Sequence, residues 1–122
     1  MRKTILTLAL VTVAVLVIGL APPPSRGADG SYFYWAQTTV ATNSVSTCYS
    51  FAESVLSYES FANIRRSPGE VTGSKGATYA AIMCVGTTPR ATAVVAAVGN
   101  QNSEVARIRD LLTSKMRGVR GY

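Results

Sequence analysis

The segment that decides the fold runs from Thr78 to Gly99 and reads TYAAIMCVGTTPRATAVVAAVG. It contains two apolar runs with many β-branched residues, and each run has the usual length of a β-strand. Between them lies the turn-forming sequence Gly86-Thr87-Thr88-Pro89. Pro89 cannot donate a hydrogen bond to a neighbouring strand, so it belongs in the connection. The segment therefore predicts a β-hairpin at the centre of the domain.

Both sides of this hairpin are apolar. In its first strand Ala80, Ile82 and Cys84 share one side, while the other side carries Tyr79, Ala81, Met83 and Val85. An antiparallel sheet with one free face normally alternates apolar with polar residues, and a soluble monomer rarely leaves a large contiguous apolar patch open. We therefore predict that Tyr79, Met83 and Val85 belong to a binding surface, used for self-association or for a partner. The alternative is that small alanines and a folded-back N-terminal segment leave no such surface.

A further strand is predicted at Ser31 to Ala41, SYFYWAQTTVA, which is dense in aromatic and β-branched residues. Its run Tyr32-Phe33-Tyr34-Trp35 is the most concentrated aromatic feature of the chain. Alternate strand residues face opposite ways, so two of these rings face the helices and two face away. We name Tyr34 and Trp35 as candidates for the binding surface, where an exposed ring could stack on a sugar or on a partner's apolar surface. Core packing alone also accounts for the run.

Two helices are predicted. The first has candidate N-caps in Thr42-Asn43-Ser44 and an apolar stripe with steps of three and four, formed by Cys48, Phe51, Val55, Tyr58 and Ala62. The second has Asn102 as its predicted N-cap and runs to about Arg117, with a buried stripe of Val105, Ile108, Leu112 and Met116.

The segment between the first helix and the hairpin is punctuated by turns. Ile64 to Gly69 breaks the helix, and its Pro68-Gly69 pair cannot lie within a central strand. Glu70 to Thr72 is then at most a short edge strand. The element order β-α-β-β-β-α predicts a small α+β domain with a three- to four-stranded antiparallel or mixed sheet and both helices on one face. No internal repeat divides the chain, so we expect a single domain at residues 28–122.

The first twenty-seven residues have the pattern of a secretory signal peptide. Arg2 and Lys3 precede an apolar run from Ile5 to Leu20, and the proline-rich segment Ala21 to Gly27 follows. Sixteen helical residues span roughly 24 Å, less than the ~30 Å hydrocarbon core, so a retained membrane anchor is the weaker alternative. We predict cleavage between residues 21 and 30, membrane contact only before cleavage, and export to the periplasm or the extracellular medium.

Cleavage changes the charge of the chain. Arg2, Lys3 and Arg26 would be removed while all six acidic residues stay, so the formal charge falls from +6 to +3. An exported chain of this modest charge is not expected to bind nucleic acid. The remaining basic residues of the predicted loops could meet acidic envelope polymers; they are Arg65, Arg66, Lys75 and Arg90.

Two cysteines in an exported chain favour a disulfide. Cys48 lies on the buried stripe of the first helix, and Cys84 shares a strand side with Ala80 and Ile82. Both thiols can therefore meet between helix and sheet, which predicts a Cys48–Cys84 bond. The alternative, a redox-active pair, usually has an exposed thiolate in a Cys-x-x-Cys arrangement, and these cysteines are far apart in sequence.

The chain has no histidine, which excludes Ser-His-Asp and Cys-His catalysis and histidine-based zinc sites. Glu53 and Glu59 lie six positions apart on a predicted helix and so on opposite sides, unlike a glycosidase pair. We assign no catalytic residue, cofactor or metal ligand. The leading hypothesis is a non-enzymatic, disulfide-linked binding module that recognises another protein or a component of the cell envelope. The alternatives are a small secreted enzyme or enzyme inhibitor acting through loop residues, and an oligomerising structural protein.

Overall fold

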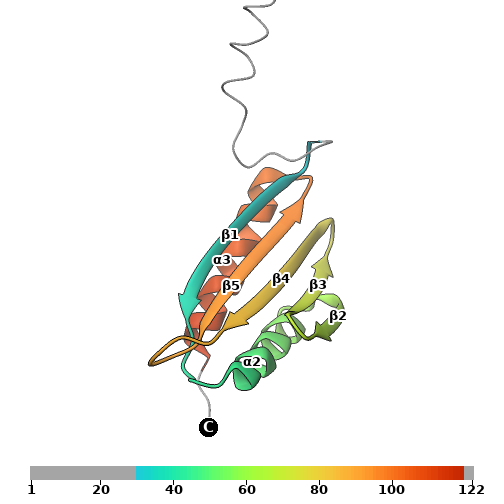
Figure 1. Cartoon of the computed structure of the whole chain (residues 1–122). Helices are drawn as coiled ribbons and strands as arrows, with labels where there is room; N and C mark the ends of the chain where they lie inside the picture. The colour runs from blue at the N-terminus through green and yellow to red at the C-terminus, as the bar shows by residue number, and fades with distance from the viewer. Residues whose placement is uncertain (1–29, 120–122) are drawn as a thin grey trace, which may run out of the picture.

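The computed structural model describes residues 30–119, which form an α+β domain with one five-stranded antiparallel sheet and two helices (Figure 1). The strand order in the sheet is β1-β5-β4-β3-β2. The predicted signal peptide lies outside the described residues. In chain order the elements are β1 (Tyr32–Thr39), α2 (Val45–Tyr58), β2 (Ala62–Ser67), β3 (Glu70–Lys75), β4 (Thr78–Val85), β5 (Thr92–Gly99) and α3 (Asn102–Gly118).

The predicted central hairpin is confirmed. Strands β4 and β5 pair from Thr78↔Gly99 to Val85↔Thr92, and Pro89 lies in their connection. On one side of the hairpin β5 pairs with β1, and on the other β4 pairs with β3. The hairpin therefore supplies the middle of the sheet, to which strands are added on both flanks.

The segment at residues 62–67 differs from the prediction, because it forms the edge strand β2. Helix α2 ends at Tyr58, and left-handed φ values at Ser60 (65°) and Asn63 (55°) turn the chain before and at the start of β2. Pro68-Gly69 is then the turn of a β2–β3 hairpin rather than a simple helix stop. Strand β3 is correspondingly six residues long and internal, not a short edge strand.

Both helices pack on the same face of the sheet, as predicted. Helix α3 lies against β1 and β5, and α2 lies against β4, β3 and β2 (Figure 1). The predicted α3 stripe is confirmed, since all four of its residues are fully buried. The largest fully buried side chains of the core are Leu56, Ile82, Ile108, Leu112 and Met116.

The buried face of α2 is rotated relative to the predicted stripe. Cys48 and Val55 are buried as expected, but Tyr58 in the last turn is 78% exposed. The positions that complete the face are Tyr49, Ala52 and Leu56, which extend it to one side of the predicted stripe. The positions of Cys48 and Val55, seven residues apart, were predicted correctly, whereas the step from Val55 to Tyr58 leads away from the sheet. Ala62, the last predicted member of the stripe, lies in β2.

The two helix starts are stabilised differently. Ser44 is the N-cap of α2, and its hydroxyl accepts a hydrogen bond from the Thr47 N–H at 3.1 Å. For α3 the N-cap is Gln101, which makes no side-chain capping bond, and the predicted cap Asn102 is the first helical residue. The Asn102 side-chain oxygen instead accepts a hydrogen bond from the Tyr34 hydroxyl.

The predicted disulfide is confirmed. It joins Cys48 of α2 to Cys84 of β4, with their Cα atoms 6.1 Å apart, and both residues are buried. The Tyr49 hydroxyl donates a hydrogen bond to the Cys84 carbonyl at 3.3 Å, which adds a second link between the same two elements. Within residues 30–119, neither helix is long and apolar enough to cross a membrane.

Candidate functional site

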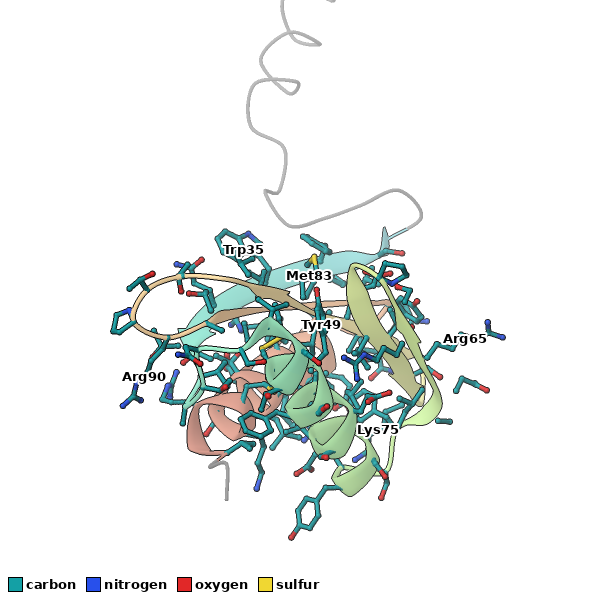
Figure 2. The ribbon with its side chains drawn as sticks, turned by 60° about the horizontal axis from the view of Figure 1, so that its bottom comes forward. Trp35, Tyr49, Arg65, Lys75, Met83 and Arg90 are labelled. Carbon is teal, nitrogen blue, oxygen red and sulfur yellow. A yellow bond between two sulfur atoms is a disulfide. The ribbon has the colours of Figure 1, made fainter. Side chains whose placement is uncertain are left out.

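The sheet face opposite the helices carries most of the large apolar side chains that are exposed in the described residues. Figure 2 shows both helices below the sheet, with Trp35 and Met83 above it. Five large apolar side chains are exposed in the described part of the chain, and only Tyr58 lies on the helix side. The other four are Trp35, at 56% exposure, and Phe33, Tyr79 and Val85, each at 48%. We call this side of the sheet the open face.

Strand register explains how these side chains gather. Phe33 pairs with Val98, which in turn pairs with Tyr79, so the three residues form one row across β1, β5 and β4. The next row contains Trp35 followed by two alanines, Ala96 and Ala81. Large rings at the ends of one row therefore flank small residues in the next.

This alternation of large and small residues leaves a shallow apolar hollow on the open face. Its volume is about 150 Å³, and its lining residues are Phe33, Tyr79, Ala81, Ala96, Ala97 and Val98. A protruding apolar group of a partner could enter the space above the alanines and contact both rings. The hollow is thus an open depression that a partner's side chain could contact, not a closed cavity.

The structure brings four of the five predicted surface residues together on the open face: Trp35, Tyr79, Met83 and Val85. Tyr34 is not among them, because it lies on the helix side of β1 and packs against the core. Its hydroxyl bonds to Asn102, and the Arg109 guanidinium lies 5.4 Å from its ring centroid. Adjacent strand residues cannot share a face, so alternation alone already separated Tyr34 from Trp35.

Phe33 takes the place of Tyr34 and was not identified from the sequence as a surface residue. Strand alternation places it on the same side as Trp35. What the sequence did not show is that β1 pairs with β5, which brings Phe33 into one row with Tyr79. A prediction of this pairing would have identified the hollow.

The basic residues differ in their pairing. Arg66 contacts Glu53 at 3.2 Å, and the Lys75 ammonium donates to the Glu59 carbonyl at 2.7 Å. By contrast, the side chains of Arg65, in β2, and Arg90, in the β4–β5 connection, form no ion pair or hydrogen bond with other residues of the described chain, and Figure 2 shows both pointing outward. Of the four basic residues predicted to lie in loops, only Arg90 does so. The other three lie in strands or at a strand end: Arg65, Arg66 and Lys75.

A larger groove of about 580 Å³ lies on the helix side, between α2 and α3. The Lys115 ammonium lies 5.7 Å from the Tyr58 ring centroid and 3.7 Å from a Glu59 carboxylate oxygen. The charges that line the groove are therefore already paired with each other. We rank the open face above this groove as a binding surface, because its exposed rings have no charged partner among residues 30–119. The groove is lined by Ser54, Val55, Tyr58, Glu59, Ser114, Lys115, Gly118 and Val119.

The acidic residues of the described chain are dispersed, and several of them form ion pairs. In residues 30–119, no three cysteine or carboxylate side chains are grouped so that they could hold a metal ion. A hydrogen bond from Arg107 lowers the pKa of Glu104, and this exposed pair lies on the surface of α3. Glu53 and Glu59 are paired with Arg66 and Lys115 respectively.

No protein family, curated protein or solved structure matches this chain.

Proposed function

We propose that this chain is an exported, non-enzymatic binding module whose open face contacts an apolar surface of a partner protein. The observation that carries the proposal is the grouping of Phe33, Trp35, Tyr79 and Val85 on the sheet face that neither α2 nor α3 covers. Exposed aromatic rings of this kind are typical of protein interfaces. The disulfide beneath them fixes α2 to the sheet and helps hold the face in one shape.

The expected strength of this contact follows from the exposed area. About half of each of the three rings is exposed, which amounts to roughly 250 Å² in total. Burying that area contributes roughly 6 kcal/mol, from which the entropy cost of association is subtracted. A micromolar complex needs about 8 kcal/mol net, so the rings alone support only weak binding. A stable complex would also need contacts from the rim of the open face.

Export is supported by two independent features: the signal-like first twenty-seven residues and the disulfide, a bond that persists in oxidising compartments. Fractionation of producing cells with N-terminal sequencing tests it. We expect a shortened chain outside the cytoplasm that begins between Pro22 and Ser31. Full-length protein retained in the inner membrane would contradict the proposal.

The binding surface can be tested by site-specific crosslinking in producing cells. A photoreactive amino acid at Tyr79 should give an adduct with a partner, whereas the same group at Ser114, on the exposed side of α3, should not. A Trp35→Ser substitution should abolish the Tyr79 adduct, because it removes an exposed ring from the same face. Equal adducts from both positions, or a Tyr79 adduct that survives Trp35→Ser, would refute the assignment of the open face.

The chain's only tryptophan gives a second readout, because Trp35 lies on the open face. Its emission should shift to shorter wavelength when a partner excludes water from the ring. Binding without any change in Trp35 emission would place the contact elsewhere.

A further inference from the structure

The two edges of the sheet differ in how well they are protected. Edge strand β2 is short, its register with β3 shifts between Ala62 and Arg65, and it carries two arginines. Charges, irregular register and short length are the means by which proteins block unwanted pairing at sheet edges. Edge strand β1, YFYWAQTT, has eight residues with no charge, glycine or proline, and its register with β5 is regular throughout. Edge β1 is therefore suited to accept another strand.

The hydrogen-bonding pattern shows which backbone groups of β1 face outward. In an antiparallel ladder, alternate residues bond to one neighbour and the remainder point the other way. Just beyond the end of the β1–β5 ladder, the Val40 N–H donates to the Ala91 carbonyl at 3.0 Å. This pair continues the register of the ladder, so even-numbered residues bond to β5. Consistent with this, the Trp35 carbonyl accepts a hydrogen bond at 3.2 Å from Arg109 of α3 rather than from β5. The outward-pointing residues are Phe33, Trp35, Gln37 and Thr39.

We propose that edge β1 pairs with edge β1 of a second copy of this chain, antiparallel about a two-fold axis at Ala36. The four outward-pointing residues are symmetric about that position. Phe33 then lies opposite Thr39 of the second copy, and Trp35 lies opposite Gln37 of the second copy. Each such pair exchanges two N–H···O bonds, so every outward amide of β1 gains a partner. The result is a continuous ten-stranded sheet.

A second copy is favoured over an unrelated strand by this self-complementary spacing and by charge. Because β1 carries no charged side chain, two copies of it do not repel each other along the edge. The pairing also brings the Phe33 and Trp35 rings of both copies to one continuous open face. This doubles the apolar surface that a partner could contact, so the dimer extends the binding surface without occupying it.

Arg109 is compatible with this pairing but opposes it weakly. A carbonyl oxygen has two lone pairs, so the Trp35 carbonyl can accept from Arg109 below the sheet and from a strand in its plane. The Arg109 side chains of the two copies would lie near the axis, and each is partly neutralised by Asp110, whose carboxylate lies 2.5 Å away. Salt screens the remaining repulsion, so dimerisation should strengthen as ionic strength rises.

The test is the mass in solution of the protein recovered from producing cells, measured by light scattering over a concentration series. The wild type should rise from the mass of one chain to that of two. Gln37→Pro removes one outward N–H and leaves the β1–β5 ladder intact, so it should remain at the mass of one chain. The matched control Gln37→Thr keeps the amide and should dimerise like the wild type.

A second variant separates this proposal from the function proposed above. Trp35→Thr removes an open-face ring but keeps the outward amide, so it should lose partner binding and still dimerise. A wild type that stays at the mass of one chain throughout would overturn edge pairing, as would equal masses for Gln37→Pro and Gln37→Thr. A dimer that is lost in Trp35→Thr but kept in Gln37→Pro would assign self-association to the open face instead.

Amide hydrogen exchange on the wild type keeps the proposal testable if Gln37→Pro fails to fold. Raising the protein concentration should slow exchange at the outward amides of Phe33, Trp35 and Gln37 by at least about tenfold. Exchange at Tyr34 and Ala36, which bond to β5 in either state, should change little. Outward amides whose exchange is independent of concentration would overturn the dimer.

Discussion

Breaking the Cys48–Cys84 bond should remove much of the stability of this domain. The bond closes a loop with a sequence separation of 36 residues, which corresponds to about 4 kcal/mol in the chain-entropy description of disulfides. Domains of this size unfold with about 5–15 kcal/mol, so the reduced protein should be marginal. Both cysteines are buried between α2 and β4, and the free thiols would stay packed there without constraining the unfolded chain.

Urea unfolding followed by circular dichroism, with and without reductant, measures this effect. With an m-value of about 1–2 kcal/mol per molar urea, the midpoint should fall by roughly 2–4 M on reduction. The double variant Cys48→Ala/Cys84→Ala is the control, because reductant should leave its midpoint unchanged. A wild-type loss below about 1 kcal/mol would refute the view that this bond is a main source of stability.

Other substitutions test the core, the sheet and the surface. Gly99→Ala should lower the free energy of unfolding by about 1–3 kcal/mol, because the added Cβ would lie 2.9 Å from the Ala77 carbonyl oxygen. An unchanged melting temperature would contradict this. Leu112→Ala should cost about 2–5 kcal/mol, since the side chain is fully buried, and a smaller loss would mean that the core refills the space. Met83→Asp should leave the domain folded by circular dichroism but abolish partner binding, and retained binding would count against the open face. The pKa of Glu104 is lowered in the folded state, so the stability that its carboxylate contributes is present above the unfolded pKa and is lost as pH falls through the folded pKa. Glu104→Gln should therefore lose less stability on acidification than the wild type. Identical dependence of stability on pH in the two proteins would show that the exposed pair with Arg107 does not contribute to stability.

The parts of the fold that could be predicted are those with a strong local pattern. The β4–β5 hairpin has two apolar runs around a proline, and the α3 stripe repeats at helical spacing with every predicted member buried. The disulfide was predicted from the helical period of α2 and the strand period of β4. The first placed Cys48 on the inward side, and the second placed Cys84 there. The hairpin and the helix each needed only the pattern of one short segment, and the disulfide needed the patterns of two.

Strand β2 could not be predicted in this way because nearly all of its residues are exposed. Its sequence ANIRRS has no alternation of buried and exposed apolar residues, and its position depends on pairing with β3 and on the left-handed Asn63. The open face was only partly predictable for a related reason. Strand alternation sorted the residues of β4, but the row from Phe33 to Tyr79 depends on long-range register, which no local pattern specifies.

The position of β1 also bears on how the chain folds. This strand is the first of the domain, yet its ladder partner is the fifth strand, and its side-chain contacts with α3 join residues up to 79 positions apart. Contacts of such high sequence separation slow folding, because a long loop is closed before they form. Until β5 is synthesised, the aromatic strand YFYWAQTT has neither ladder nor helix to pack against. Of the strands of the sheet, this uncharged aromatic one therefore waits longest for its partner, which makes β1 a segment that a holding chaperone would be expected to bind.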